Sequence, residues 1–166
     1  MNRRQILSAI GGFSVAPAGG CLWSNEERTD AIVRDVREFL ESESASSDEI
    51  LVLSADEVEE SEFHPGGVSV GLRHVLPFTT DDDPAAIRDA VDSNSYHVAD
   101  ACLERTDEIL RIEINSYVRD PDKEVAPEVS YVHLRWDALE EVDWTAIGPA
   151  DVPDSVTRYW FDETPF

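Results

Sequence analysis

Ser69 lies at the centre of a Gly-Val-Ser-Val-Gly stretch, which matches the G-x-S-x-G pattern of a nucleophilic serine. In that pattern the serine sits on a sharp turn between a strand and a helix, and its hydroxyl attacks an acyl carbon. The flanking sequence does not favour this context, because residues 55–66 are acidic and residues 72–77 read as a strand that ends in proline. We therefore expect Ser69 to point outward from a strand whose Val70 and Leu72 pack inward.

A second group of residues has the chemistry of a binding surface. Residues 109–119 and 129–137 alternate apolar and polar side chains, as the two strands of an antiparallel hairpin do. The polar side of this hairpin combines aromatic and basic side chains, namely Tyr117, Tyr131, His133 and Arg135. Such side chains together can bind a carboxylate or a sugar, and ordinary cross-strand pairing is the alternative interpretation.

The charges along the hairpin predict a register for its two strands. We expect Arg111 to face Asp137 and Glu113 to face Arg135, because opposite charges then lie across from each other on the polar side. In the same register Ile112 meets Trp136 on the apolar side, so that every cross-strand pair is compatible.

Asp120, Asp122 and Glu124 have the alternate spacing with which a calcium-binding loop begins. Val125 stands where that loop requires glycine, and Tyr131 stands where it requires glutamate. We therefore expect a solvated loop, with a loose surface cation site as the alternative. The four histidines show no ligand spacing and no cysteine pair exists, so we expect neither a zinc site nor a cofactor.

The first 21 residues form a distinct segment. Arg3 and Arg4 are an adjacent basic pair, and a short apolar, glycine-rich stretch follows them. The segment ends with three small residues directly before a cysteine: Ala18, Gly19, Gly20 and Cys21. It resembles a twin-arginine export signal that ends in a lipoprotein cleavage box. Its apolar stretch is shorter than the about 20 residues that a membrane-spanning helix needs.

The resemblance implies cleavage before Cys21 and a lipid on its thiol. Residues 1–20 would then be the signal peptide, residues 21–24 a lipidated start and short tether, and residues 25–166 a single domain. The protein would be held at the cell membrane through Cys21 and would face the outside of the cell. Two alternatives remain open: an exported protein that is cut but not lipidated, and a cytosolic N-terminus with a chance arginine pair.

The chain of 166 residues contains 36 acidic and 13 basic residues, which gives a formal net charge of −23. Lys123 is its only lysine. This composition resembles that of proteins from salt-loving microbes such as haloarchaea, in which hydrated carboxylates limit precipitation. So acidic a surface argues against nucleic acid as a partner, because nucleic acid requires basic patches. It also argues against attraction to anionic lipid through overall charge.

The order of the expected elements indicates an α+β fold, with an antiparallel sheet, helices packed on one face and a single small domain. The expected elements are a helix over 25–42, strands over 50–53 and 68–76, a helix over 84–104, the hairpin and a short helix over 139–144. Residues 156–161 fit either a strand or a helix. Cys102 lies at the spacing of apolar neighbours, so we expect a buried thiol in the core.

These observations predict a membrane-anchored extracytoplasmic lipoprotein that is adapted to high salt and is not an enzyme. Its role would be binding, or assembly with envelope proteins. Two alternatives stay open. One is a small extracellular serine hydrolase that uses Ser69, and the other is a lipoprotein that binds a small ligand on the outer face of the hairpin.

Overall fold

A computed structural model describes residues 25–124, 126–144, 146–152 and 157–160 of the chain. Within this part, no helix is both long and apolar enough to cross a bilayer. The expected signal and lipidation residues lie outside the described residues; they are Arg3, Arg4, Ala18, Gly19, Gly20 and Cys21.

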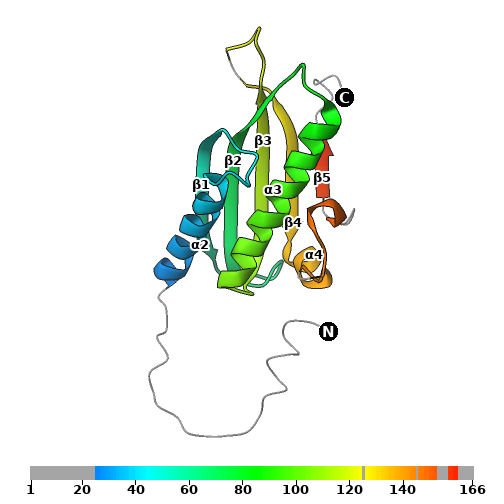
Figure 1. The fold of residues 1–166 in the computed structure, drawn as a ribbon. Coiled ribbons are helices and arrows are strands. Elements are labelled where there is room, and N and C mark those ends of the chain that lie inside the picture. The colour runs from blue at the N-terminus through cyan, green and yellow to red at the C-terminus, as the bar shows by residue number, and fades with distance from the viewer. Residues whose placement is uncertain (1–24, 125, 145, 153–156, 161–166) are drawn as a thin grey trace, which may run out of the picture.

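The described part folds into one five-stranded sheet with helices (Figure 1). In chain order the elements are α2 (Asn25–Leu40), β1 (Glu49–Val58), β2 (Gly67–Thr79), α3 (Pro84–Arg105), β3 (Ile109–Arg119), β4 (Glu128–Arg135), α4 (Trp136–Glu141), a 3₁₀ helix (Pro149–Asp151) and β5 (Thr157–Trp160). The strands lie in the order β1-β2-β3-β4-β5. The α+β class is confirmed, and the ambiguous segment near the C-terminus contains a strand.

The sheet is mostly antiparallel, with one parallel pair. β2 and β3 run in the same direction because α3 carries the chain back along the sheet between them. The other three neighbouring pairs are antiparallel.

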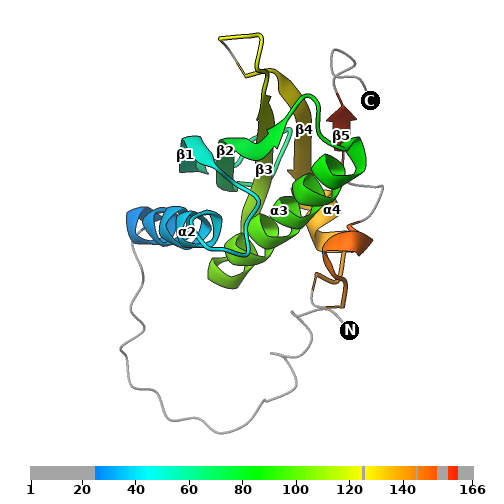
Figure 2. The same ribbon diagram turned by 45° about the horizontal axis from the view of Figure 1, so that its top comes forward.

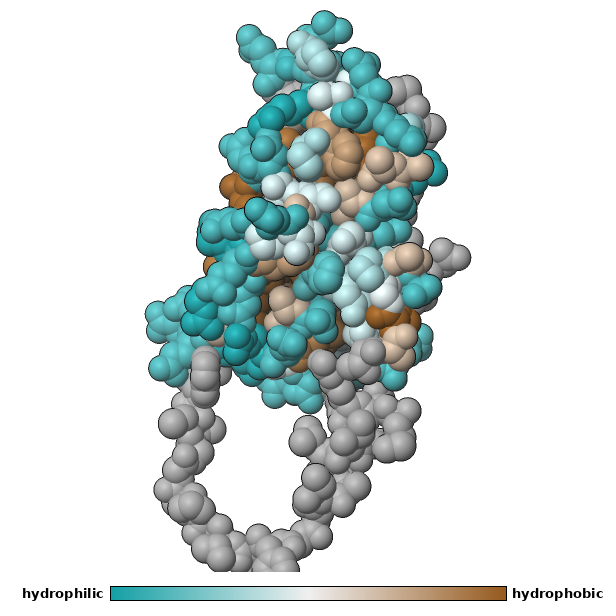
Figure 3. All heavy atoms as spheres, in the orientation of Figure 1, coloured by the Kyte–Doolittle hydropathy of each residue, from teal (hydrophilic) through white to brown (hydrophobic). Residues whose placement is uncertain are grey.

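The two longer helices cover the same face of the sheet (Figures 1 and 2). Their apolar sides pack on the inward side chains of the central strands. The buried cluster includes Ile32 and Val36 of α2, Ile87 and Val91 of α3, and, from the strands, Val70, Leu72, Ile112, Ile114, Val132 and Leu134. Figure 3 shows that the solvent side of these helices is largely hydrophilic, in keeping with the acidic composition. The opposite face of the sheet is therefore the face on which outward strand residues meet solvent.

The start of α3 follows from local chemistry. The Asp83 carboxylate accepts a hydrogen bond from the Ala85 backbone N–H at 3.0 Å, and Pro84 occupies the first turn. The helix ends at Arg105, within one residue of the expected end.

β1 differs from the short buried strand that its apolar run predicts. It spans ten residues at the edge of the sheet, and the side chains of Leu51 and Val52 are 47% and 46% exposed. The pairing with β2 is irregular between Ile50 and Val52. An apolar run does not show whether other elements will cover its side chains. The expected burial of this strand is therefore wrong.

The predicted hairpin register is wrong by two residues. Arg111 pairs with Arg135 and Glu113 pairs with His133. β4 ends at Arg135 because α4 begins at Trp136, so Trp136 and the next residue cannot pair with β3. A shift of two residues keeps every side chain on its expected face, so hydrophobic alternation does not distinguish the two registers.

Candidate functional site

The four residues singled out on the hairpin, Tyr117, Tyr131, His133 and Arg135, lie on the face that the helices leave uncovered. Only two of them line a pocket, although the rings of Tyr131 and His133 are neighbours with centroids 6.0 Å apart. Tyr131 donates a hydrogen bond to Glu113 at 3.2 Å, and Tyr117 pairs with Glu128 at a bulge near the far end of β3. His133 and Arg135 instead line a pocket at the end where β3 begins and β4 ends.

This outer-face pocket has a volume of about 250 Å³. Its described lining consists of four apolar and four basic or imidazole side chains: Val58, Phe63, Leu110, Trp136, His64, Arg111, His133 and Arg135. None of these lining residues is acidic. In a chain with nearly three acidic residues for each basic one, this composition sets the pocket apart from the rest of the surface.

The two arginines of the pocket are only loosely paired with carboxylates. Arg111 lies 3.8 Å from Glu113, and Arg135 lies 3.6 Å from Asp137, measured between the nearest nitrogen and oxygen atoms. Both distances exceed the 2.7–3.2 Å range of an N–H···O hydrogen bond. Both side chains are about half exposed. Their guanidinium groups are therefore available to a bound anion, which a planar fork of N–H donors can bind at two points.

His133 contributes a neutral imidazole to this pocket. Burial lowers its pKa below the ordinary histidine value; Glu113 opposes that shift, and the positive charges of Arg111 and Arg135 add to it. Its Nε2 atom is buried and makes no hydrogen bond within the described residues. A ligand group that reaches Nε2 would satisfy this atom, which otherwise costs desolvation energy.

Phe63 forms the apolar rim of the pocket. It projects from the loop that joins β1 to β2, and 85% of its surface is exposed. The loop is tightened by a backbone bridge between Ser61 and His64, and the Phe63 N–H donates to the Ser61 hydroxyl at 3.3 Å. Together with Trp136, Phe63 offers the pocket aromatic surface beside its positive charges.

Ser69 lies within β2 and points away from the core, as expected, while Val70 and Leu72 are buried. The strand continues for ten residues beyond it, so the sharp turn of the G-x-S-x-G pattern is absent from this described segment. The Ser69 hydroxyl accepts a hydrogen bond from Arg111 Nε at 2.8 Å. Its structural role is therefore to orient one of the two arginines of the pocket.

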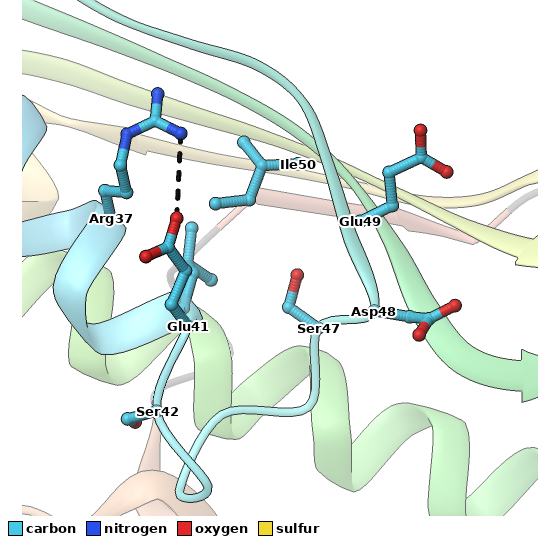
Figure 4. A pocket seen from close by; sticks show the side chains of 8 residues that line it. Arg37, Glu41, Ser42, Ser47, Asp48, Glu49 and Ile50 are labelled. Atoms are coloured by element: carbon cyan, nitrogen blue, oxygen red, sulfur yellow. Dashed lines mark ion pairs between the residues drawn. The ribbon is translucent and has the colours of Figure 1, made fainter.

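A second hollow of about 420 Å³ lies at the opposite end of β1, beside the end of α2 (Figure 4). Its lining is rich in carboxylates and hydroxyls: Arg37, Leu40, Glu41, Ser42, Ser47, Asp48, Glu49 and Ile50. Arg37 and Glu41 form an ion pair of 3.9 Å across its opening.

His74 lies beneath this second hollow, buried on the inward side of β2. Its Nδ1 atom is 3.3 Å from the Ser47 hydroxyl, and its Nε2 atom is 3.0 Å from the Ser116 hydroxyl. Burial lowers the pKa of His74 to about 4, so the ring is neutral at pH 7. The spacing of the four histidines as potential metal ligands gives no indication of this buried role. A polar residue at an inward position of an alternating strand, here between Leu72 and Leu76, is the signal that identifies it.

In the loop at 120–124, the Asp120 side chain forms its contacts within the loop itself. The Asp120 carboxylate accepts the Asp122 backbone N–H at 3.0 Å and pairs with Lys123 at 3.2 Å. These contacts, the backbone hydrogen bond first, lower the pKa of Asp120. Glu124 is exposed beside them. Among the described residues no group of three or more histidine, cysteine or acidic side chains is arranged to hold a metal ion.

Cys102 is confirmed as a core residue. Its side chain is completely buried on α3, and burial raises the pKa of its thiol to about 12. A thiol that stays protonated at neutral pH is a poor nucleophile, so Cys102 acts as a small apolar side chain.

Comparison of the chain with protein-family models, with curated proteins and with solved structures found no match.

Proposed function

We propose that this protein is a lipid-anchored extracytoplasmic binding domain whose outer-face pocket takes a small organic anion. The observation on which the proposal depends is the lining of that pocket. Arg111 and Arg135 lie beside His133 and no described lining residue is acidic, although the chain as a whole has a formal net charge of −23. The lining of the pocket is therefore basic, whereas the composition of the chain would lead one to expect mostly acidic side chains there.

The chemistry of the pocket favours a carboxylate or phosphate group joined to an apolar body. Arginine binds both groups through paired N–H donors. The aromatic surface of Phe63 and Trp136 would contact the apolar body. A volume of about 250 Å³ suits a small molecule or the end of a larger one, because typical ligand pockets begin near this size.

The export signal and the lipid on Cys21 remain expectations from the sequence. They support a domain that works at the outer side of the cell membrane, and the acidic composition supports adaptation to high salt. Envelope proteins would be its partners if the ligand is the exposed end of another protein.

The test uses the full chain with Cys21→Ser, which cannot receive the lipid, in multimolar salt. Phenyl phosphate and benzoate are titrated by calorimetry, with benzyl alcohol as the uncharged counterpart. We expect both anions to bind and the alcohol to bind at least about tenfold more weakly, because a charge-assisted pair contributes roughly 1.5–3 kcal/mol.

A double substitution identifies the site. Arg111→Gln with Arg135→Gln should weaken phenyl phosphate binding by about tenfold or more. Arg119→Gln is the matched control, because Arg119 is a similarly exposed arginine at the other end of β3, paired with Asp48. Equal binding of the anions and the alcohol, or equal effects of the two sets of substitutions, would refute the proposal.

A further inference from the structure

The pocket and the start of α2 lie at the same end of the sheet. Arg28, in the first turn of α2, forms ion pairs with Glu57 near the end of β1 and with Glu108 just before β3. Val58, the residue after Glu57, and Leu110, two residues after Glu108, line the outer-face pocket. Figure 1 shows the first turn of α2 and α4 at one end of the molecule.

The expected lipid on Cys21 therefore limits how far from the membrane the pocket can lie. Only residues 22–24 separate Cys21 from α2, and the four residue steps from Cys21 to Asn25 span at most about 14 Å when fully extended. β2 alone has 13 residues and extends about 40 Å along the sheet. The end with the pocket is thus held next to the bilayer, and the end with the second hollow is held away from it.

The side chains at this end fit a phosphate-bearing bilayer surface. Phe63, at the tip of its loop, has the highest exposure among the exposed large hydrophobic side chains of the described residues. An exposed phenylalanine side chain can insert at the boundary between headgroups and acyl chains, and arginine binds phosphate through paired donors. Arg111 and Arg135 line the same pocket as Phe63.

We propose that the outer-face pocket faces the membrane that carries the anchor, and that its anion is the phosphate of a lipid headgroup. This inference rests on the proposed anion-binding function and on the lipid at Cys21. Phe63 enters the interfacial layer, the two arginines bind the phosphate, and the lipid on Cys21 keeps the domain close enough for this contact. The docking fixes the orientation of the domain on the membrane.

Salt should strengthen this docking, which is the reverse of ordinary electrostatic binding. Glu59, Glu60 and Glu62 flank Phe63, and a bilayer of negative charge repels them. The Debye length falls from about 10 Å at 0.1 M to about 3 Å at 1 M, so salt removes this repulsion first and leaves direct contacts less affected.

The experiment measures co-sedimentation of the full chain, with Cys21→Ser, with vesicles over a series of potassium chloride concentrations from low salt to multimolar salt. One vesicle is phosphatidylglycerol, and the other is digalactosyl diacylglycerol, which has no phosphate. We expect binding to phosphatidylglycerol to exceed binding to the glycolipid by about tenfold and to rise with salt up to about 1 M.

Two variants at the pocket are compared with two at the other end of the sheet. Phe63→Ser and the double substitution Arg111→Gln with Arg135→Gln should each reduce phosphatidylglycerol binding by about tenfold. Leu51→Ser and Arg119→Gln should leave it within about twofold, since Leu51 is 47% exposed and Arg119 is a surface arginine. Near-ultraviolet circular dichroism shows that each variant is folded.

The outcomes separate this inference from the proposed function. If phenyl phosphate binds through the arginines but neither vesicle binds, the membrane-facing pocket is refuted and the anion site stands. If both vesicles bind equally, the phosphate assignment is refuted. If phenyl phosphate does not bind at all, the proposed function fails as well. Equal losses in the pocket variants and the control variants would also overturn the inference.

Discussion

Arg28 and Glu108 are separated by 80 residues in the sequence, yet Arg28 Nη1 and Glu108 Oε2 lie 2.7 Å apart. Arg28 also pairs with Glu57, so one guanidinium joins α2 to β1 and to the residue just before β3. These hydrogen bonds, the one to Glu57 first, raise the pKa of Arg28 above its ordinary value. The contact fixes the start of α2 at the end of the sheet that carries the outer-face pocket.

Arg28→Gln should lower the free energy of unfolding by about 1 kcal/mol, because it breaks a small network at the surface. Arg37→Gln is the control: the Arg37–Glu41 pair is exposed and 3.9 Å long, so its loss should cost less than about 0.5 kcal/mol. Urea unfolding at several salt concentrations measures both, and the difference should shrink as salt rises. Equal costs would contradict the role assigned to Arg28.

Gly67→Ala should destabilise the protein by about 2 kcal/mol or more. Gly67 has φ of +154°, and an added Cβ would lie 2.4 Å from the Glu108 carbonyl oxygen. Gly71→Ala, in the same strand, meets only the Ser54 hydroxyl at 3.4 Å and should change stability by less than about 0.5 kcal/mol. Thermal unfolding compares the two variants; if they lose stability equally, the close approach at Gly67 is not the cause.

His74 should make stability depend on pH. The folded ring binds a proton only near a pKa of about 4, whereas the unfolded ring binds one near 6.5. The unfolded state therefore holds more protons between these values, so the His74 contribution is complete above pH 6.5 and is lost as pH falls towards 4. The loss amounts to about 3 kcal/mol across this window.

The comparison of wild type with His74→Gln isolates this effect, because repulsion among the carboxylates acts in both proteins. Denaturant unfolding at constant high salt, from pH 7.5 to about 4.5, should show the stability difference between the two proteins narrowing as pH falls. A difference that stays constant across this range would rule out titration of a buried His74.

Asn94→Ala should cost about 2 kcal/mol. Asn94 is buried on α3, donates to the Ser46 carbonyl at 2.8 Å and accepts the Ser46 N–H at 3.1 Å, so its loss leaves two backbone groups without these partners. Asn115→Ala should cost less than about 1 kcal/mol, because Asn115 lies half-buried on the outer face. Hydrogen exchange at the Ser46 amide should accelerate only in the Asn94 variant.

The local features of the chain could be predicted without coordinates. Asp83 and Pro84 specify the start of α3 through capping and a preset backbone angle, and the alternation of residues 109–119 specifies a strand and its buried face. The inward position of Val70 and the burial of Cys102 follow from the same periodicities.

The hairpin register and the parallel pair could not be predicted in this way. A shift of two residues leaves the faces of β3 and β4 unchanged, so only the start of α4 at Trp136 decides between the registers. The parallel pairing of β2 with β3 depends on where α3 packs, and no residue of either strand encodes it locally.

The outer-face pocket also combines residues that local sequence patterns place together with residues that only the tertiary structure brings to them. Sequence patterns place His133 and Arg135 on one face of a strand, because the side-chain period of a strand is a local property. They do not bring in Phe63 from the loop after β1, and the register that they predict sets Arg111 opposite Asp137 instead of Arg135, because these contacts depend on pairing across the sheet and on its twist. Local chemistry thus decided the elements and the acidic surface, and long-range packing decided which few basic residues share a pocket.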